Sequence, residues 1–139
     1  EHILCEFNMI QDAANVVSRA HGTNGLLENI ALESFLLHIR QVRDFFYGVR
    51  KNKWPDDTFA SDYASNWESV QPDLPRVIKE HEERLDRQLA HLSYARLRYK
   101  GKEKEWPVDE MATAMAEVVR VFLRSLPQDR AAWFSGVRL

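Results

Sequence analysis

Residues 84–99, RLDRQLAHLSYARLRY, carry the pattern on which both the predicted fold and the predicted site depend. A helix turns by about 100° per residue, so residues three and four apart lie on one face. Here, and just upstream, such a face carries apolar side chains: Leu74, Ile78, Leu85, Leu89 and Leu92. This spacing predicts a long helix from residue 73 or 75 to about residue 99.

Basic side chains border this leucine face. Arg84, Arg87, His91 and Arg98 fall within about 60° of one another on a helix. Guanidinium groups bind phosphate and carboxylate oxygens, and an imidazole exchanges protons near neutral pH. The pattern indicates an anion site, with His91, Arg84 and Arg87 as candidate catalytic groups and Arg98 as a phosphate ligand. The alternative is a solvated rim of arginines, with His91 packed over the bundle edge.

The composition describes a soluble globular chain. It has 139 residues, 45% of them hydrophobic and 29% charged, which fits one domain over residues 1–139. With a formal net charge of −2, nucleic-acid binding requires a local basic patch. Cys5 is the single cysteine and suits a reducing cytoplasm. The sequence lacks a membrane-span pattern and a signal-peptide pattern, so we expect a cytoplasmic protein without membrane contact.

The remaining periodicity predicts further helices over 1–20, about 25–50 and about 107–126. Between about 48 and 75 the periodicity fails, and prolines interrupt the chain. This connection carries bulky aromatic residues, so we expect it to pack down as an ordered cover with a short helix near 57–66: Trp54, Phe59, Tyr63 and Trp67. The predicted fold is all-α, an antiparallel bundle of four main helices with this long connection between the second and third.

Some polar residues of the predicted helices fall on apolar faces. Arg96 lies on the leucine face, where a buried charge needs a carboxylate partner, and Glu33 and Asp44 are the candidates. His38 belongs to the same predicted structural network. Arg40 and Asp44 have the i,i+4 spacing of an ion pair.

Motifs of the common cofactor-dependent enzymes are missing from the sequence. It has no P-loop, dinucleotide-binding glycine pattern or nucleophile elbow, and no HExxH or Glu-x-x-His pair. A metal site assembled across helices from His38, His81 and acids is an alternative, but we predict no metal and no cofactor. The remaining chemistry is metal-free phosphate transfer, in which an imidazole moves a proton and guanidiniums stabilise charge.

Several phrases are similar to one family: ALESFLLHIRQVRDFFYG (31–48), DDTFASDY (56–63), RQLAHLSYAR (87–96) and Glu105-Trp106. Together with the Arg-spacer-His arrangement, they resemble the HEPN domain (higher eukaryotes and prokaryotes nucleotide-binding), in its abortive-infection-associated branch. The resemblance covers about residues 25–125. It implies an all-α bundle that dimerises, and His91 matches the motif histidine. Arg84 fits the family spacing, whereas Arg87 departs from it.

The resemblance leads to two hypotheses. In the first, the protein is a metal-independent endoribonuclease of the toxin or phage-defence type, a homodimer in which Arg84, Arg87 and His91 act on RNA. In the second, it is a non-catalytic helical module that dimerises, binds a nucleotide or docks an antitoxin protein.

Overall fold

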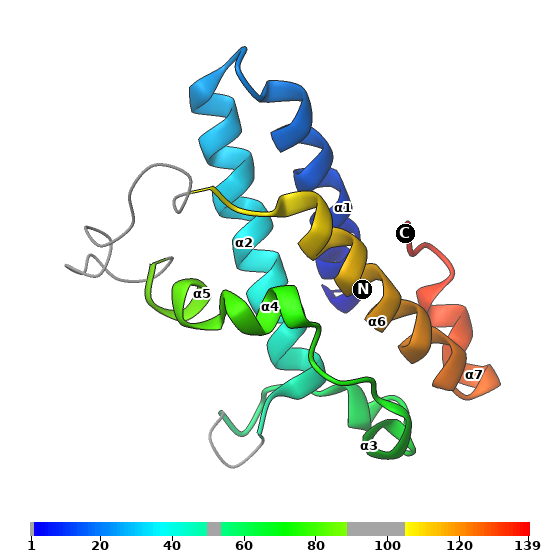
Figure 1. Cartoon of the computed structure of the whole chain (residues 1–139). Coiled ribbons are helices and arrows are strands. Elements are labelled where there is room, and N and C mark those ends of the chain that lie inside the picture. Colours follow the sequence, from blue (N-terminus) through cyan, green and yellow to red (C-terminus); the bar gives the residue numbers. More distant parts are fainter. Residues whose placement is uncertain (1, 50–53, 89–104) are drawn as a thin grey trace.

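A computed structural model of the chain describes residues 2–49, 54–88 and 105–139 (Figure 1). Within these ranges the regular structure is helical and includes no strand, which confirms the all-α prediction. In chain order the elements are α1 (His2–Ala20), α2 (Gly25–Tyr47), η2 (Ala60–Asp62), α3 (Trp67–Val70), α4 (Arg76–Glu80), α5 (Glu82–Gln88), α6 (Val108–Ser125), α7 (Gln128–Ala131) and η5 (Ala132–Phe134).

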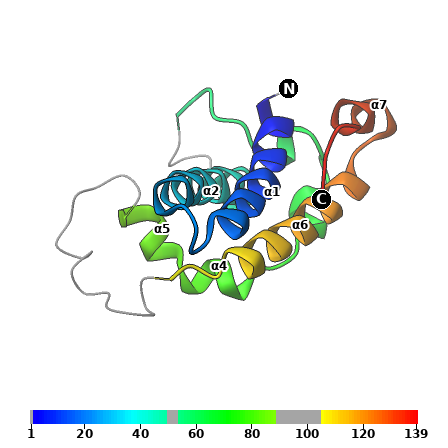
Figure 2. The same ribbon diagram turned by 90° about the horizontal axis from the view of Figure 1, so that it is seen from above.

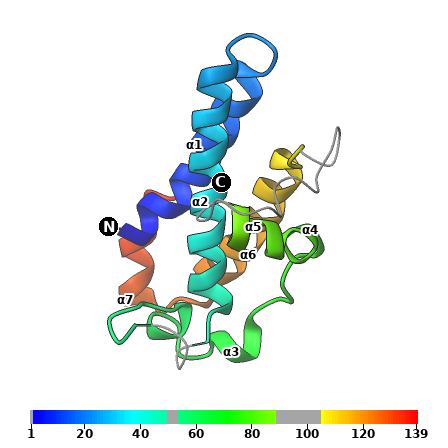
Figure 3. The ribbon, with the colours of Figure 1, turned by 90° about the vertical axis from the view of Figure 1, so that its left-hand side faces the viewer.

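α1 and α2 form an antiparallel hairpin, as their amphipathic patterns predict (Figure 1). The turn between them contains Gly22 with φ of 68°, a left-handed conformation that glycine adopts at low cost. Asn24 then caps α2 by accepting a hydrogen bond from the backbone N–H of Leu27 at 3.1 Å. The turn end of this hairpin extends beyond the other helices (Figures 1 and 3).

Aromatic rings fill the centre of the core. The Phe122 ring of α6 meets other rings edge-on, with centroid separations from 5.4 to 6.2 Å: Phe7, Phe45, Phe46, Trp67 and Phe134. Such edge-to-face pairs match the quadrupoles of the rings. α6 itself lies between α1 and α4 (Figure 2), and its apolar stripe is buried, as predicted.

The connection after α2 packs down largely as predicted. Phe59 and Trp67 are buried, and the Trp67 indole donates a hydrogen bond to the Phe46 carbonyl at 3.2 Å. The short helices within this connection are η2 and α3. Trp54 does not belong to this cover, because it is 78% exposed.

The predicted third long helix is interrupted at His81, between α4 and α5, which corrects the expectation of one uninterrupted helix. The His81 imidazole Nδ1 lies 2.9 Å from the Val77 carbonyl, the group that a continuous α-helix pairs with the His81 backbone N–H. That N–H instead bonds to the Ile78 carbonyl. A side chain that competes for a backbone partner is a known cause of helix kinks. The predicted continuation beyond residue 88 lies outside the described residues.

Candidate functional site

Arg84, a predicted catalytic group, is buried with 8% of its surface exposed. Its guanidinium carbon lies 3.9 Å from the centre of the Trp106 ring, and Nη1 donates to the Glu105 carbonyl at 3.3 Å. The His81 ring is also close to Trp106, with centroids 5.6 Å apart. These contacts join α4 and α5 to the segment that precedes α6, so Arg84 has a clear packing role here.

Arg87 lies one turn further along α5 in a different environment. Its side chain is 61% exposed, and Nη1 lies 3.1 Å from Glu83, the residue four positions earlier. An exposed pair of this kind contributes about 1 kcal/mol or less, so Arg87 is available to another anion. Acidic residues share the short helix, however: Glu82, Glu83 and Asp86. Arg84 is therefore covered by other residues, whereas Arg87 is accessible to solvent.

The other members of the predicted cluster, His91 and Arg98, lie outside the described residues, as does Arg96 of the predicted polar network. Their assigned roles stay predictions. Of the acids proposed for Arg96, Glu33 is exposed, whereas Asp44 is bound by a neighbouring arginine on α2.

That arginine is Arg43, which the sequence reasoning missed. Its side chain is 7% exposed, and Nε and Nη2 donate to Asp44 Oδ1 at 3.1 and 2.8 Å. Nη2 also donates to Asp86 Oδ1 of α5 at 2.8 Å. Burial alone lowers the pKa of Arg43, but the bonds to Asp86 and Asp44 outweigh it, so the pKa is raised. Arg43 therefore stays charged and fastens α5 to α2.

The expected Arg40–Asp44 ion pair is replaced by tertiary pairing, since Arg40 Nε lies 3.4 Å from Asp86 instead. His38, also predicted in the polar network, does take part in a polar contact. Its Nδ1 is 2.6 Å from Glu6 Oε2 of α1, and the carboxylate accepts the bond. His38 thus links the two helices of the hairpin.

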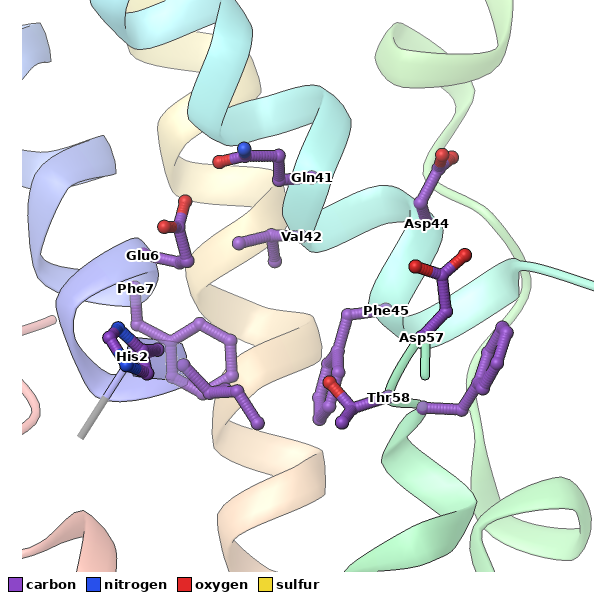
Figure 4. A pocket seen from close by; sticks show the side chains of 11 residues that line it. His2, Glu6, Phe7, Gln41, Val42, Asp44, Phe45, Asp57 and Thr58 are labelled. Carbon is purple, nitrogen blue, oxygen red and sulfur yellow. The ribbon is translucent and has the colours of Figure 1, made fainter. Parts of the chain in front are cut away.

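Glu6 also borders a cavity of about 350 Å³ between α1, α2 and residues 57–59 (Figure 4). Apolar side chains form much of its wall: Ile3, Phe7, Val42, Phe45 and Phe59. Polar side chains complete it: His2, Glu6, Gln41, Asp44, Asp57 and Thr58. In Figure 4, Glu6 lies on one side and Asp57 on the other, with Val42 and the rings of Phe7 and Phe45 between them. This cavity could not be predicted from the sequence, because its walls come from three separate segments.

The described ranges contain neither a candidate metal site nor a candidate membrane-spanning helix. They hold no group of three or more His, Cys, Asp or Glu side chains arranged for a metal ion. None of their helices combines the length and apolar character that crossing a bilayer requires.

Comparison with known proteins identified no relative of this chain. The chain matches no protein family, no curated protein and no solved structure.

Proposed function

We propose that this chain is a helical module that self-associates, with two copies pairing through the solvent-facing side of α2. A stripe on this helix carries the proposal: Leu26, Ile30 and Leu37 are 73%, 57% and 45% exposed. They lie on one face and run from the first turn of α2 to its middle. The turn end of the hairpin extends beyond the other helices (Figure 3). Leu27 borders the stripe and is also exposed.

The size of the stripe sets the expected affinity. These four side chains leave on the order of 400 Å² of apolar surface in water per copy, a size typical of contact patches. Burying both copies of the stripe, about 800 Å² at about 25 cal/mol per Å², contributes about 20 kcal/mol, against an association cost of about 4–15 kcal/mol. We therefore expect a weak dimer, with a Kd on the order of 10 µM.

A second copy fits the stripe because the stripe is complementary to itself. In an antiparallel pair with the two-fold axis between residues 33 and 34, Ile30 faces Leu37 of the second copy, and the reverse contact repeats it. Glu33 interrupts the apolar spacing near that axis. Two glutamates brought out of water there weaken the pair, which keeps the association reversible.

Sedimentation equilibrium over about 5–500 µM protein tests this proposal, since the range brackets the expected Kd. We expect Ile30→Glu to abolish the dimer and Glu33→Leu to tighten it by about tenfold, because leucine completes the stripe. Thr113→Glu and Thr113→Leu, at an exposed position of α6, are the matched controls. The proposal fails if Ile30→Glu dissociates no dimer, or if cross-linking finds the stripe covered by residues 89–104 of the same copy.

A second candidate is the metal-independent endoribonuclease of the HEPN type. Arg87 favours it, because its exposed guanidinium is held by a surface pair that a phosphate oxygen replaces at little cost. In this proposal His91 moves the proton, Arg87 and Arg98 hold the phosphate, and Arg84 supports α5 from within. The two copies supply two histidines, and the products are a 2′,3′-cyclic phosphate and a 5′-hydroxyl end.

Incubation of the protein with bulk RNA in EDTA tests this second candidate. We expect His91→Ala to remove cleavage and Arg87→Ala to reduce it strongly. Arg76→Ala is the matched control, because Arg76 is an exposed arginine on α4 in the same kind of i,i+4 pair, with Glu80. Unchanged cleavage by the His91→Ala protein rejects the ribonuclease.

A further inference from the structure

The cavity bordered by Glu6 and Asp57 has the chemistry of a ligand site. Its volume of about 350 Å³ is at the small end of the range for ligand pockets, so it suits a compact molecule. Aromatic rings in its wall, those of Phe7, Phe45 and Phe59, favour a flat or apolar ligand body. Neither feature determines the charge of the ligand, which depends on the charged side chains at the rim of the cavity.

The rim of the cavity is acidic, and its three carboxylates differ in how far their charge is balanced. Asp44 is neutralised by Arg43 at 2.8 Å. Glu6 accepts a bond from His38 at 2.6 Å. Asp57 accepts one from the neutral backbone N–H of Trp54 at 3.0 Å, and among the described residues no Lys, Arg or His is within ion-pair distance of it. Asp57 therefore offers negative charge at the mouth of the cavity.

We propose that the cavity binds a small organic cation, an amine or amidine carried on an aromatic or apolar body. The body lies against Phe7, Val42 and Phe45, and the cationic end lies between Asp57 and Glu6 (Figure 4). A charge-assisted hydrogen bond to a carboxylate fixes the orientation. An anion of the same shape is repelled by the same rim, so this site selects against phosphate and carboxylate ligands. None of Leu26, Leu27, Ile30 and Leu37 lines the cavity.

Three isosteric probes separate charge from shape: benzamidine, benzamide and benzoate, which carry a positive, a neutral and a negative end on the same ring. We expect benzamidine to shift the amide signals of Val42, Thr58 and Phe59 in ¹⁵N NMR spectra of the whole chain. For a ligand this small the expected Kd is on the order of 1 mM. Benzamide then binds about tenfold more weakly, and benzoate gives no saturable shift.

The variants Asp57→Asn and Asp56→Asn form a matched pair, because both remove one charge from adjacent loop residues and only Asp57 lines the cavity. We expect Asp57→Asn to weaken benzamidine binding about fivefold and Asp56→Asn to leave it unchanged. Glu6→Gln is the second test, and the NMR spectrum of each variant reports whether it is folded. Equal binding of the three probes, shifts that map elsewhere, or equal effects of the two aspartate variants overturn the proposal.

Discussion

The buried Arg43 gives the sharpest test of how this fold is held together. We predict that Arg43→Met lowers the free energy of unfolding by about 3 kcal/mol. The substitution removes bonds to two carboxylates, each worth about 1.5–3 kcal/mol when an ion is involved. Two effects reduce the loss: methionine fills much of the space of the arginine stem, and Asp44 and Asp86 are 29% and 44% exposed, so water partly replaces their partner.

Urea denaturation followed by circular dichroism measures this loss, and a double-mutant cycle with Asp86→Asn isolates the pair. We expect a coupling energy of about 1–2 kcal/mol between Arg43 and Asp86. Arg40 is the internal control, because it reaches the same carboxylate at 3.4 Å from a side chain that is 34% exposed. The coupling energy between Arg40 and Asp86 should be below about 1 kcal/mol. The reasoning is refuted if Arg43→Met costs under about 1 kcal/mol, or if Arg40 couples to Asp86 as strongly as Arg43 does.

Three further predictions concern single contacts. Arg84→Lys keeps the charge but loses the planar stack on Trp106, so urea denaturation should show a loss of about 1 kcal/mol. Burial, with a smaller contribution from the charge of Asp73, raises the pKa of Tyr47 to about 12. The folded state therefore retains this proton, and stability falls as pH rises from about 10 towards 12. Tyr47→Phe should remove that part of the fall and the tyrosinate absorbance step near pH 12. Gly48→Ala places a Cβ in steric conflict with the Asp44 carbonyl oxygen, so the melting temperature should drop by several degrees, corresponding to about 1–3 kcal/mol.

The parts of the fold that follow from local chemistry were predictable from the sequence. α1, α2 and α6 agree with the predicted segments to within a few residues. In each case a helical apolar spacing ends at a residue that cannot continue it, such as Gly22 or Pro127. These signals act within a few positions of the chain, so they do not depend on tertiary packing.

The features that the sequence did not reveal depend on partners distant in the chain or on a single side-chain rotamer. The i,i+4 rule paired Arg40 with Asp44, but Asp86, 42 positions beyond Asp44, displaced that pairing. The kink at His81 leaves Ile78 and Leu85 buried on the same side, so the apolar period passes through it unchanged. The apolar period of a sequence indicates which face of a helix is buried. It does not reveal that an imidazole has taken the carbonyl partner of a backbone N–H.

The contrast between Arg84 and Arg87 shows why a cluster on a helical wheel does not by itself define an anion site. Residues three apart point about 60° away from each other, which is enough for one to be covered and the other to face solvent. Here Trp106, 22 positions beyond Arg84, provides the cover. A phosphate that contacts both guanidiniums has to displace this ring, whereas Arg87 needs only to leave Glu83. Of these two arginines, Arg87 is therefore the one open to a phosphate, whereas Arg84 contributes to the position of α5.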